Sequence, residues 1–492
     1  MFMESRPSDN SFAVHGIPIV GSAFRGGPAL ILAILLISMT AGCGEGRTAP
    51  RLPSEVGVDP FVHDTITRTA DAVEKAPRNP RAWAQLGELY YAHDYLESAL
   101  ECFDVAVELG PEDPRIRYLR AVIRKRLGDD TGAFEDIEET IRLDDSTPHV
   151  RWRAALWYRD GGNFERAERL ATDAMQLSGG DRNSRRTLAL IELEAGRARQ
   201  AIRLLRPIVK ARPDDRQTRT TLVRALRLSG DLPAAEREAV LAGDVRPDYF
   251  DPWLDAAVTR RTDLPFWIRR AQRIANQGDP ETARTIQDSV LRKWYPEARE
   301  VDFTEGVILV SEGRHDEAAV HFEALVEEHP DWSQAMNRAA AAMLVDSGTD
   351  PDPEVDRRAR SLLERSTVIE PGNHVARVLL VDILVRSDEL DAAQPLMEEI
   401  VAAQGWMLEH RLKLARIQFE RGDQEESLAT LDDAIVIFGP VPPIDLARAS
   451  ILIDLGRLDE AATAIGRARS RPNVPQQQIR RLEDRLREAS AP

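Results

Sequence analysis

The sequence predicts an all-α protein, built as a solenoid of about eleven antiparallel helical hairpins. Two observations support this prediction: alanine recurs at steps of 34 residues, and glycine recurs with the same period. Each glycine ends an amphipathic segment, and each alanine follows five residues later in the next segment, so one period holds two helices joined by a tight turn. The alanines are Ala99, Ala133, Ala167, Ala201 and Ala235, and the glycines are Gly128, Gly162, Gly196 and Gly230.

Residues 1–42 are predicted to be a signal peptide. The apolar run ALILAILLISM at 29–39 is too short for a comfortable transmembrane helix, and small residues follow it. The stretch before Cys43 resembles a bacterial lipobox, although Thr40 departs from the usual leucine. The resemblance implies lipid attachment at Cys43 and a place on the periplasmic face of a bacterial cell envelope, with the outer membrane favoured because Gly44 follows. Ordinary secretory cleavage and an uncleaved anchor are the open alternatives.

The next segment, residues 43–58, is rich in glycine and proline and shows no hydrophobic period, so we expect a flexible linker. Residues 59–243 are predicted to hold an N-terminal cap helix, at 65–76, and repeat units 1 to 5.

The stretch 83–111 resembles the tetratricopeptide repeat. All eight signature positions match, namely Trp83, Leu86, Gly87, Tyr90, Ala99, Phe103, Ala106 and Pro111. The resemblance covers about 80–475. It implies a right-handed superhelix, in which the first helix of each unit lines a concave inner face, and a function in binding other proteins.

Two interruptions break the 34-residue period. The first, at 244–263, adds 14 residues, and we expect it to act as a hinge between two arrays. Units 6 to 11 follow at 264–475, with a second insertion at 346–356. Residues 476–492 are predicted to form a C-terminal capping helix, because Ile479, Leu482, Leu486 and Ala489 share one helical face.

The net charge of −17 disfavours a nucleic-acid-binding surface. No HExxH, GxSxG, GxxxxGK[ST] or GxGxxG motif is present, and His315 and His321 are too far apart to share a metal at i, i+4 spacing. We therefore expect no catalytic site, no cofactor and no metal. Cys102 is expected to be a buried, inert thiol.

Two acidic groups leave calcium open as a weak alternative to helix capping and solvation. The first group is Asp346, Asp350, Asp352 and Asp356, and the second is Asp244, Asp248, Asp251 and Asp255.

The positions that the resemblance assigns to the inner face of the first five units are basic and aromatic. They predict binding of an acidic or C-terminal segment of another protein. They are Arg81, Tyr91, Arg115, Tyr118, Lys125, Arg126, Trp152, Arg159, Arg186, Arg224 and Arg227. The alternative is compositional, since only five of the 65 basic residues are lysine. The family's carboxylate clamp for chaperone tails is absent, because Ala84, Glu88 and Leu119 occupy three of its positions.

In the later units the inner positions become apolar, so they are a second candidate for a binding surface. They are Phe303, Val307, Val310, Val345, Val378, Val385, Leu412 and Phe419.

These features favour a non-catalytic scaffold that is exported, tethered to a membrane through its lipid and able to assemble or localise an envelope complex. A carrier for export of an acidic envelope polysaccharide and an enzyme with an unrecognised site are the alternatives.

Overall fold

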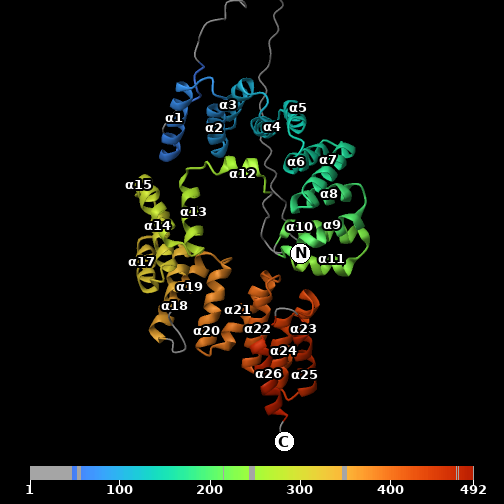
Figure 1. Cartoon of the computed structure of the whole chain (residues 1–492). Coiled ribbons are helices and arrows are strands. Elements are labelled where there is room, and N and C mark those ends of the chain that lie inside the picture. The colour runs from blue at the N-terminus through green and yellow to red at the C-terminus, as the bar shows by residue number, and fades with distance from the viewer. Residues whose placement is uncertain are drawn as a thin grey trace, which may run out of the picture. The chain divides into compact units, whose positions relative to one another are not determined.

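The computed structural model describes residues 47–52, 57–213, 215–242, 250–345, 352–471, 474 and 476–490. The chain divides into two compact units, Met1–Thr48 and Ala49–Pro492, and every described helix lies in the second unit. The described residues form helices and connecting turns and include no β-strand (Figure 1). The prediction of an all-α fold is confirmed.

Five hairpins form the first array, and each helix packs against the next one along the chain (Figure 1). They are α2 (Pro80–Ala92) with α3 (Leu96–Leu109), α4 (Pro114–Leu127) with α5 (Asp130–Leu143), α6 (Pro148–Asp160) with α7 (Phe164–Leu177), α8 (Arg182–Glu194) with α9 (Ala198–Ala211), and α10 (Arg216–Ser229) with α11 (Leu232–Val240).

Six hairpins form the second array. In the first of them α13 (Leu264–Asn276) precedes α14 (Pro280–Ile286), a π-helical turn at Gln287–Leu291 and α15 (Arg292–Trp294). The others are α16 (Arg299–Ser311) with α17 (His315–Glu328), α18 (Ser333–Val345) with α19 (Pro353–Ile369), α20 (His374–Arg386) with α21 (Leu390–Ala403), α22 (Leu408–Arg421) with α23 (Gln424–Phe438), and α24 (Pro442–Asp454) with α25 (Leu458–Arg469). The last helix, α26 (Gln476–Ala489), packs on α24 and α25 and buries Ile479 and Leu482.

Local sequence signals set the helix ends. At the start of α4 the Asp113 side chain accepts hydrogen bonds from the backbone N–H groups of Arg115 and Ile116, and Pro114 occupies the first helical turn. At its end Gly128 has a φ of 86°, a left-handed conformation that glycine adopts without steric cost. The recurring glycine of the sequence therefore reverses the chain between the two helices of a hairpin.

The recurring small residues allow the helices to approach closely. Ala99, Ala133, Ala167 and Ala201 are completely buried where paired helices meet. In the first hairpin a Cβ atom at Gly87 would come within 2.8 Å of the Phe103 ring. Larger side chains at these positions would force the hairpins apart, which explains the 34-residue period physically.

The N-terminal helix α1 (Pro60–Lys75) contains most of the predicted cap helix and also contacts the second array. Its N-cap residue Asp59 accepts a hydrogen bond from the Leu264 backbone N–H (3.0 Å), at the start of α13, and another from the Tyr295 hydroxyl (2.6 Å). The Phe61 ring stacks on Trp294 with the centroids 4.8 Å apart. Helix α1 therefore joins the first array to the first hairpin of the second.

The described end of the predicted linker is also held in place. The Tyr90 hydroxyl donates a hydrogen bond to the Pro50 carbonyl (2.7 Å), and Arg51 pairs with Asp71 (2.7 Å) and Glu74 (2.9 Å) of α1. Residues 49–52 are therefore fixed against α1 and α2, and the expectation of a flexible linker is corrected for them. Cys43 lies outside the described residues. Among the described helices, none combines the length and the apolar character needed to span a bilayer.

Candidate functional site

The inner face of the first array holds a segment of the same chain, residues 250–263, which we call the docked segment. It contains the short helix α12 (Pro252–Val258), which packs on α2 and α4 (Figure 1). Its main polar anchor is Asp251, which is only 1% exposed. The Asp251 carboxylate accepts hydrogen bonds from the Tyr118 hydroxyl and from Arg153 Nη2 (2.9 Å). A buried carboxylate needs such partners, because leaving it unpaired would cost several kcal/mol.

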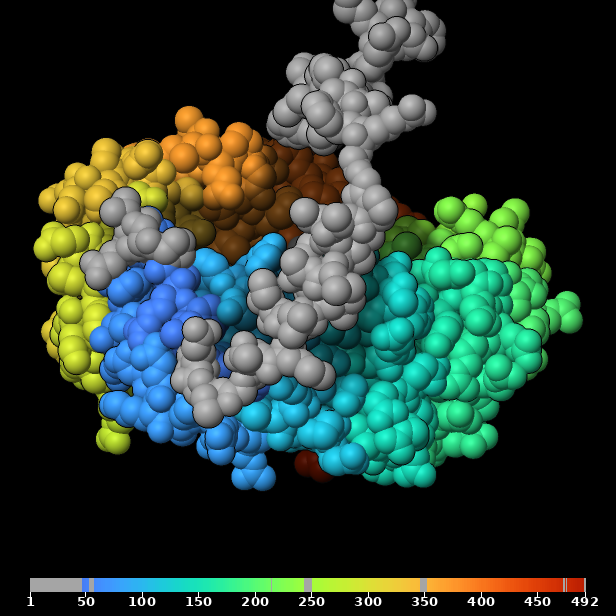
Figure 2. All heavy atoms as spheres, turned by 90° about the horizontal axis from the view of Figure 1, so that it is seen from above, coloured from blue at the N-terminus to red at the C-terminus, as the bar shows by residue number. Residues whose placement is uncertain are grey.

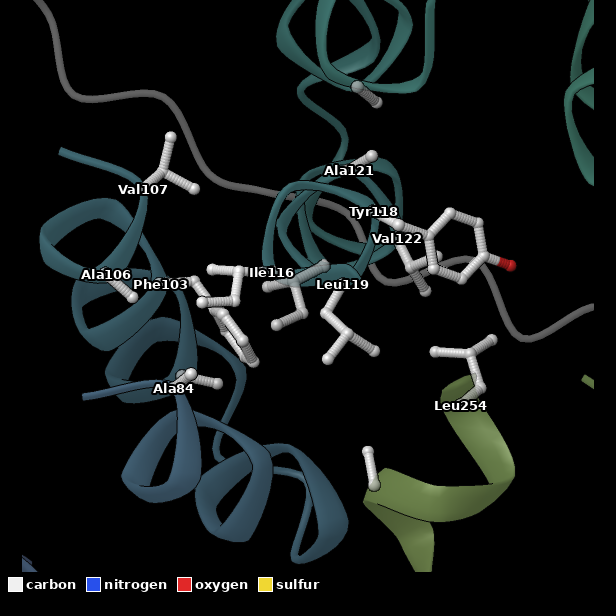
Figure 3. Close-up of a cluster of buried hydrophobic side chains, with 14 of the residues drawn as sticks. Ala84, Phe103, Ala106, Val107, Ile116, Tyr118, Leu119, Ala121, Val122 and Leu254 are labelled. Carbon is white, nitrogen blue, oxygen red and sulfur yellow. The ribbon is translucent and has the colours of Figure 1, made fainter. Parts of the chain in front are cut away.

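Apolar contacts accompany this anchor. The Trp253 ring lies 5.4 Å from Tyr118 and 4.6 Å from His149, both in edge-to-face arrangements. Leu254 points toward Tyr118 and Leu119 of α4 and belongs to the same buried cluster as the signature residues of the first hairpin (Figure 3). Burial raises the pKa of Tyr118 and lowers the pKa of His149, so both side chains are held neutral.

The other end of the docked segment is fixed by a second buried acid. Glu88 of α2 is 2% exposed and pairs with Arg260 of the docked segment and with Arg115 of α4 (2.5 Å). The Thr262 backbone N–H donates a hydrogen bond to His93 Nε2 (3.2 Å). The described part of the predicted hinge is thus bound along α2 and α4 at both of its ends.

Burial corrects the expectation of an open basic groove for three of the predicted residues. Tyr118 and Arg186 are fully buried, and Trp152 is 2% exposed. The docked segment covers Tyr118, whose hydroxyl binds Asp251 and whose ring contacts Trp253. One signal of this docking is present in the sequence: the run FDPWLD (250–255) combines two acids with aromatic and apolar residues, the chemistry that complements a basic, aromatic groove.

Most of the other predicted cations are neutralised by acids of the same chain. Arg115 pairs with Glu88, and Tyr91 is half-buried beneath the Arg126 guanidinium, 5.6 Å from its ring centroid. Three more cations form pairs with neighbouring aspartates: Lys125 with Asp130 (2.7 Å), Arg126 with Asp94 (2.6 Å) and Arg159 with Asp160 (2.6 Å).

Only three of the predicted cations keep a free charge in the described part of the chain. Arg81, Arg224 and Arg227 are exposed and have no ion pair among the described residues. The accessible positive charge of the predicted site is therefore confined to Arg81 and to helix α10.

The structure describes half of the eight aspartates that were considered as calcium ligands. Asp346, Asp350, Asp244 and Asp248 lie outside the described residues. Asp352 caps α19 by accepting from the Glu354 backbone N–H (2.8 Å), and Asp356 pairs with Arg386 (2.7 Å). Asp251 caps α12, and the Asp255 carboxylate accepts from the Asp251 backbone N–H (2.6 Å). No group of three or more potential metal ligands occurs within the described residues.

The expectation of a buried thiol at Cys102 is confirmed. Cys102 is fully buried on α3, and burial raises the pKa of its thiol. A thiol held protonated in this way is a poor nucleophile.

The inner face of the second array is partly open. Phe303 and Val307 are buried in the packing of their own hairpin, whereas Val345 is 55% exposed. Val375, at the start of α20, is 62% exposed and was not among the predicted lining residues. The remaining predicted members are half-buried: Val310, Val378, Val385, Leu412 and Phe419.

Comparison with protein-family models identifies tetratricopeptide repeats at residues 66–123, 158–220, 268–331 and 378–442, together about half of the chain. The hairpin geometry and these matches agree, and the chain belongs to the tetratricopeptide repeat family. Its repeats make it a scaffold for binding other proteins.

One curated relative is Superkiller protein 3 of Schizosaccharomyces pombe, which is 30% identical over 81 residues. The match spans 16% of this chain and only 6% of that protein. Among solved structures, yeast Tom70 shows 13% identity and a TM-score of 0.34, covering 83% of this chain and 95% of its own. A tetratricopeptide repeat protein from Parabacteroides merdae shows 12% identity and a TM-score of 0.33, covering 55% of this chain and 98% of its own.

Proposed function

We propose that this protein is an exported, membrane-tethered scaffold that binds another protein and assembles or localises a cell-envelope complex, without catalysing a reaction. The signal-like N-terminus and the lipobox resemblance at Cys43 support the export and the tether. The repeats support the binding of a protein partner.

The partner site that the geometry favours is the inner face of the second array. In the first array the docked segment covers part of the corresponding face and leaves Tyr118 inaccessible. In the second array Val345 of α18 and Val375 of α20 remain more than half exposed. Exposed apolar side chains can mark sites of protein association, and this difference in exposure between the two arrays carries the proposal.

The chemistry of this surface indicates the kind of segment that it would hold. Val378, Val385 and Leu412 are half-buried on α20 and α22 and extend the apolar surface beyond Val375. An amphipathic helix that lays its apolar face on these residues would remove them from water at little cost in polar groups.

The test compares two matched pairs of exposed valines. Val345→Glu with Val375→Glu places charge on the inner face, whereas Val368→Glu with Val436→Glu places the same charge on second helices, at residues that are 80% and 66% exposed. Partner recovery is measured by cross-linking in intact cells, solubilisation in detergent and mass spectrometry, with helicity checked by circular dichroism.

We expect the inner-face pair to reduce recovery of the partner several-fold and the control pair to leave it unchanged. Equal recovery with both pairs would reject the inner face of the second array as the site. Recovery of an acidic polysaccharide in place of a protein would favour the carrier alternative instead.

A further inference from the structure

Helix α9 carries a ridge of four positive charges on its outward face. Arg199, Arg203, Arg206 and Lys210 follow one another at steps of four, three and four residues, which places them on one stripe of the helix. All four side chains are exposed, and none of them forms an ion pair within the described part of the chain. Figure 2 shows this green part of the first array at the molecular surface. We call these four residues the α9 ridge.

The same four positions of the first hairpin carry only acids. They are Glu97, Glu101, Asp104 and Glu108 on α3, which we call the α3 ridge. Glu97 and Glu101 are exposed and have no ion pair among the described residues. Asp104 already pairs with Arg120 (3.0 Å) and Arg124 (3.2 Å) of the next hairpin. The α9 ridge thus stands out as a positive stripe, because the equivalent positions of the first hairpin are acidic and the chain as a whole carries a net charge of −17.

The two ridges are matched in geometry as well as in sign. Both helices are second helices of their hairpins, so they present their charges in the same way. A pattern with steps of four, three and four residues also reads the same from either end, so the charges align whether the two helices run parallel or antiparallel. Within one molecule the ridges cannot pair with each other, because α3 belongs to the first hairpin and α9 to the fourth of the same array.

We propose that the α9 ridge binds the α3 ridge of a second copy of this chain. This inference goes beyond the proposed function, since it gives the scaffold a means of assembling with itself. Each molecule then offers the cations of the α9 ridge and, on the α3 ridge, the exposed Glu97 and Glu101. Such head-to-tail contacts add copies one after another unless the geometry closes. The contact is electrostatic and solvent-exposed, so salt screens it. Tethering to one membrane would raise the effective concentration of the ridges and favour the contact.

The experiment uses the purified full chain in mild detergent and measures its self-association by sedimentation velocity. The runs compare a salt concentration of about 10 mM, where charges act over about 30 Å, with about 1 M, where they act over about 3 Å. The α9 variant is Arg203→Glu with Arg206→Glu, and the α3 variant is Glu97→Arg with Glu101→Arg. The control variant is Arg480→Glu with Arg481→Glu, which reverses two exposed arginines of α26 that also have no ion pair in the described part of the chain.

We expect the wild-type chain and the control to associate at low salt and to become monomeric at high salt. The α9 variant and the α3 variant should each be monomeric alone at low salt, because two reversed charges cancel the net charge of one ridge in each. An equal mixture of these two variants should associate in pairs, since the unaltered α3 ridge of the α9 variant can bind the unaltered α9 ridge of the α3 variant. That rescue cannot arise from misfolding or from a change in bulk charge.

Three results would overturn the proposal. They are a wild-type chain that stays monomeric at low salt, a control that loses association as fully as the α9 variant, and a variant mixture that fails to associate. Vesicles containing phosphatidylglycerol serve as the second probe. If they capture a monomeric wild-type chain but not the α9 variant, the ridge faces an anionic lipid surface and not a second copy.

Discussion

The Asp251 carboxylate accepts a hydrogen bond from the Tyr118 hydroxyl, although 133 positions separate the two residues in the sequence. This bond crosses from the docked segment to the second hairpin of the first array, and Arg153 of the third hairpin binds the same carboxylate. The first array therefore depends on a segment that follows it in the chain, which a simple stack of repeats would not require.

Replacing Asp251 by alanine should destabilise the protein by about 3 kcal/mol or more, because it leaves the partly buried Arg153 without its carboxylate and removes the cap of α12. Tyr118→Phe keeps the ring and loses one hydrogen bond, so it should cost about 1 kcal/mol. Urea unfolding followed by circular dichroism measures both changes. A loss for Asp251→Ala no larger than that for Tyr118→Phe would mean that Asp251 is not the main anchor.

Docking of the segment should weaken as the pH falls from about 7 to about 5. Burial lowers the pKa of His93 and of His149 from the ordinary value of 6.5, so the unfolded chain binds protons more readily than the folded chain in this range. Stability is therefore full above pH 6.5 and is lost as the pH falls toward the lower folded pKa values. Protonation of His93 Nε2 would also remove the acceptor for the Thr262 backbone N–H.

This pH dependence can be measured by urea unfolding across the same range. His93→Gln, which offers an oxygen acceptor that does not titrate there, should show a shallower dependence than the wild type. An unchanged slope in that variant would exclude His93 as a source of the effect.

Gly87→Ala should destabilise the first hairpin by roughly 1–3 kcal/mol, because the added Cβ atom would lie 2.8 Å from the Phe103 ring. Gly466 on α25 is the matched control, since a Cβ atom there meets nothing within 4 Å. Gly466→Ala should be neutral or stabilising by up to about 1 kcal/mol, as expected for glycine in a helix interior. Thermal unfolding gives the melting temperature of both variants. Equal shifts of the same sign in the two melting temperatures would contradict the packing argument.

Cys43→Ser should release the protein from the membrane fraction, because the proposed lipid can be attached only to the thiol. Fractionation and metabolic labelling with a fatty acid measure the two consequences separately. If the serine variant still fractionates with membranes, an uncleaved apolar segment is the anchor and the lipobox interpretation fails.

The sequence by itself determined the repeat architecture. The 34-residue recurrence of alanine, as at Ala133, and of glycine, as at Gly128, predicts helix pairs. Close packing of two helices requires the small alanine, and the reversal of the chain between them favours glycine. Such constraints act between neighbours along the chain, so they leave a regular trace in the sequence. The ridges on α3 and α9 could be located in the same way, since the period assigns every residue to a face.

Only the tertiary structure decided which parts of the inner face are accessible. Tyr118, Trp152 and Arg186 stand at inner positions of the repeat pattern, yet all three are buried. The accessibility of Tyr118 depends on where residues 250–263 lie, and that placement follows from contacts such as Asp251 with Tyr118 and Arg260 with Glu88. Each of these contacts joins a repeat residue to a residue of the docked segment more than 130 positions away. The 34-residue period therefore does not indicate them. The period thus indicates which face a residue occupies, and long-range burial decides whether another molecule can reach it.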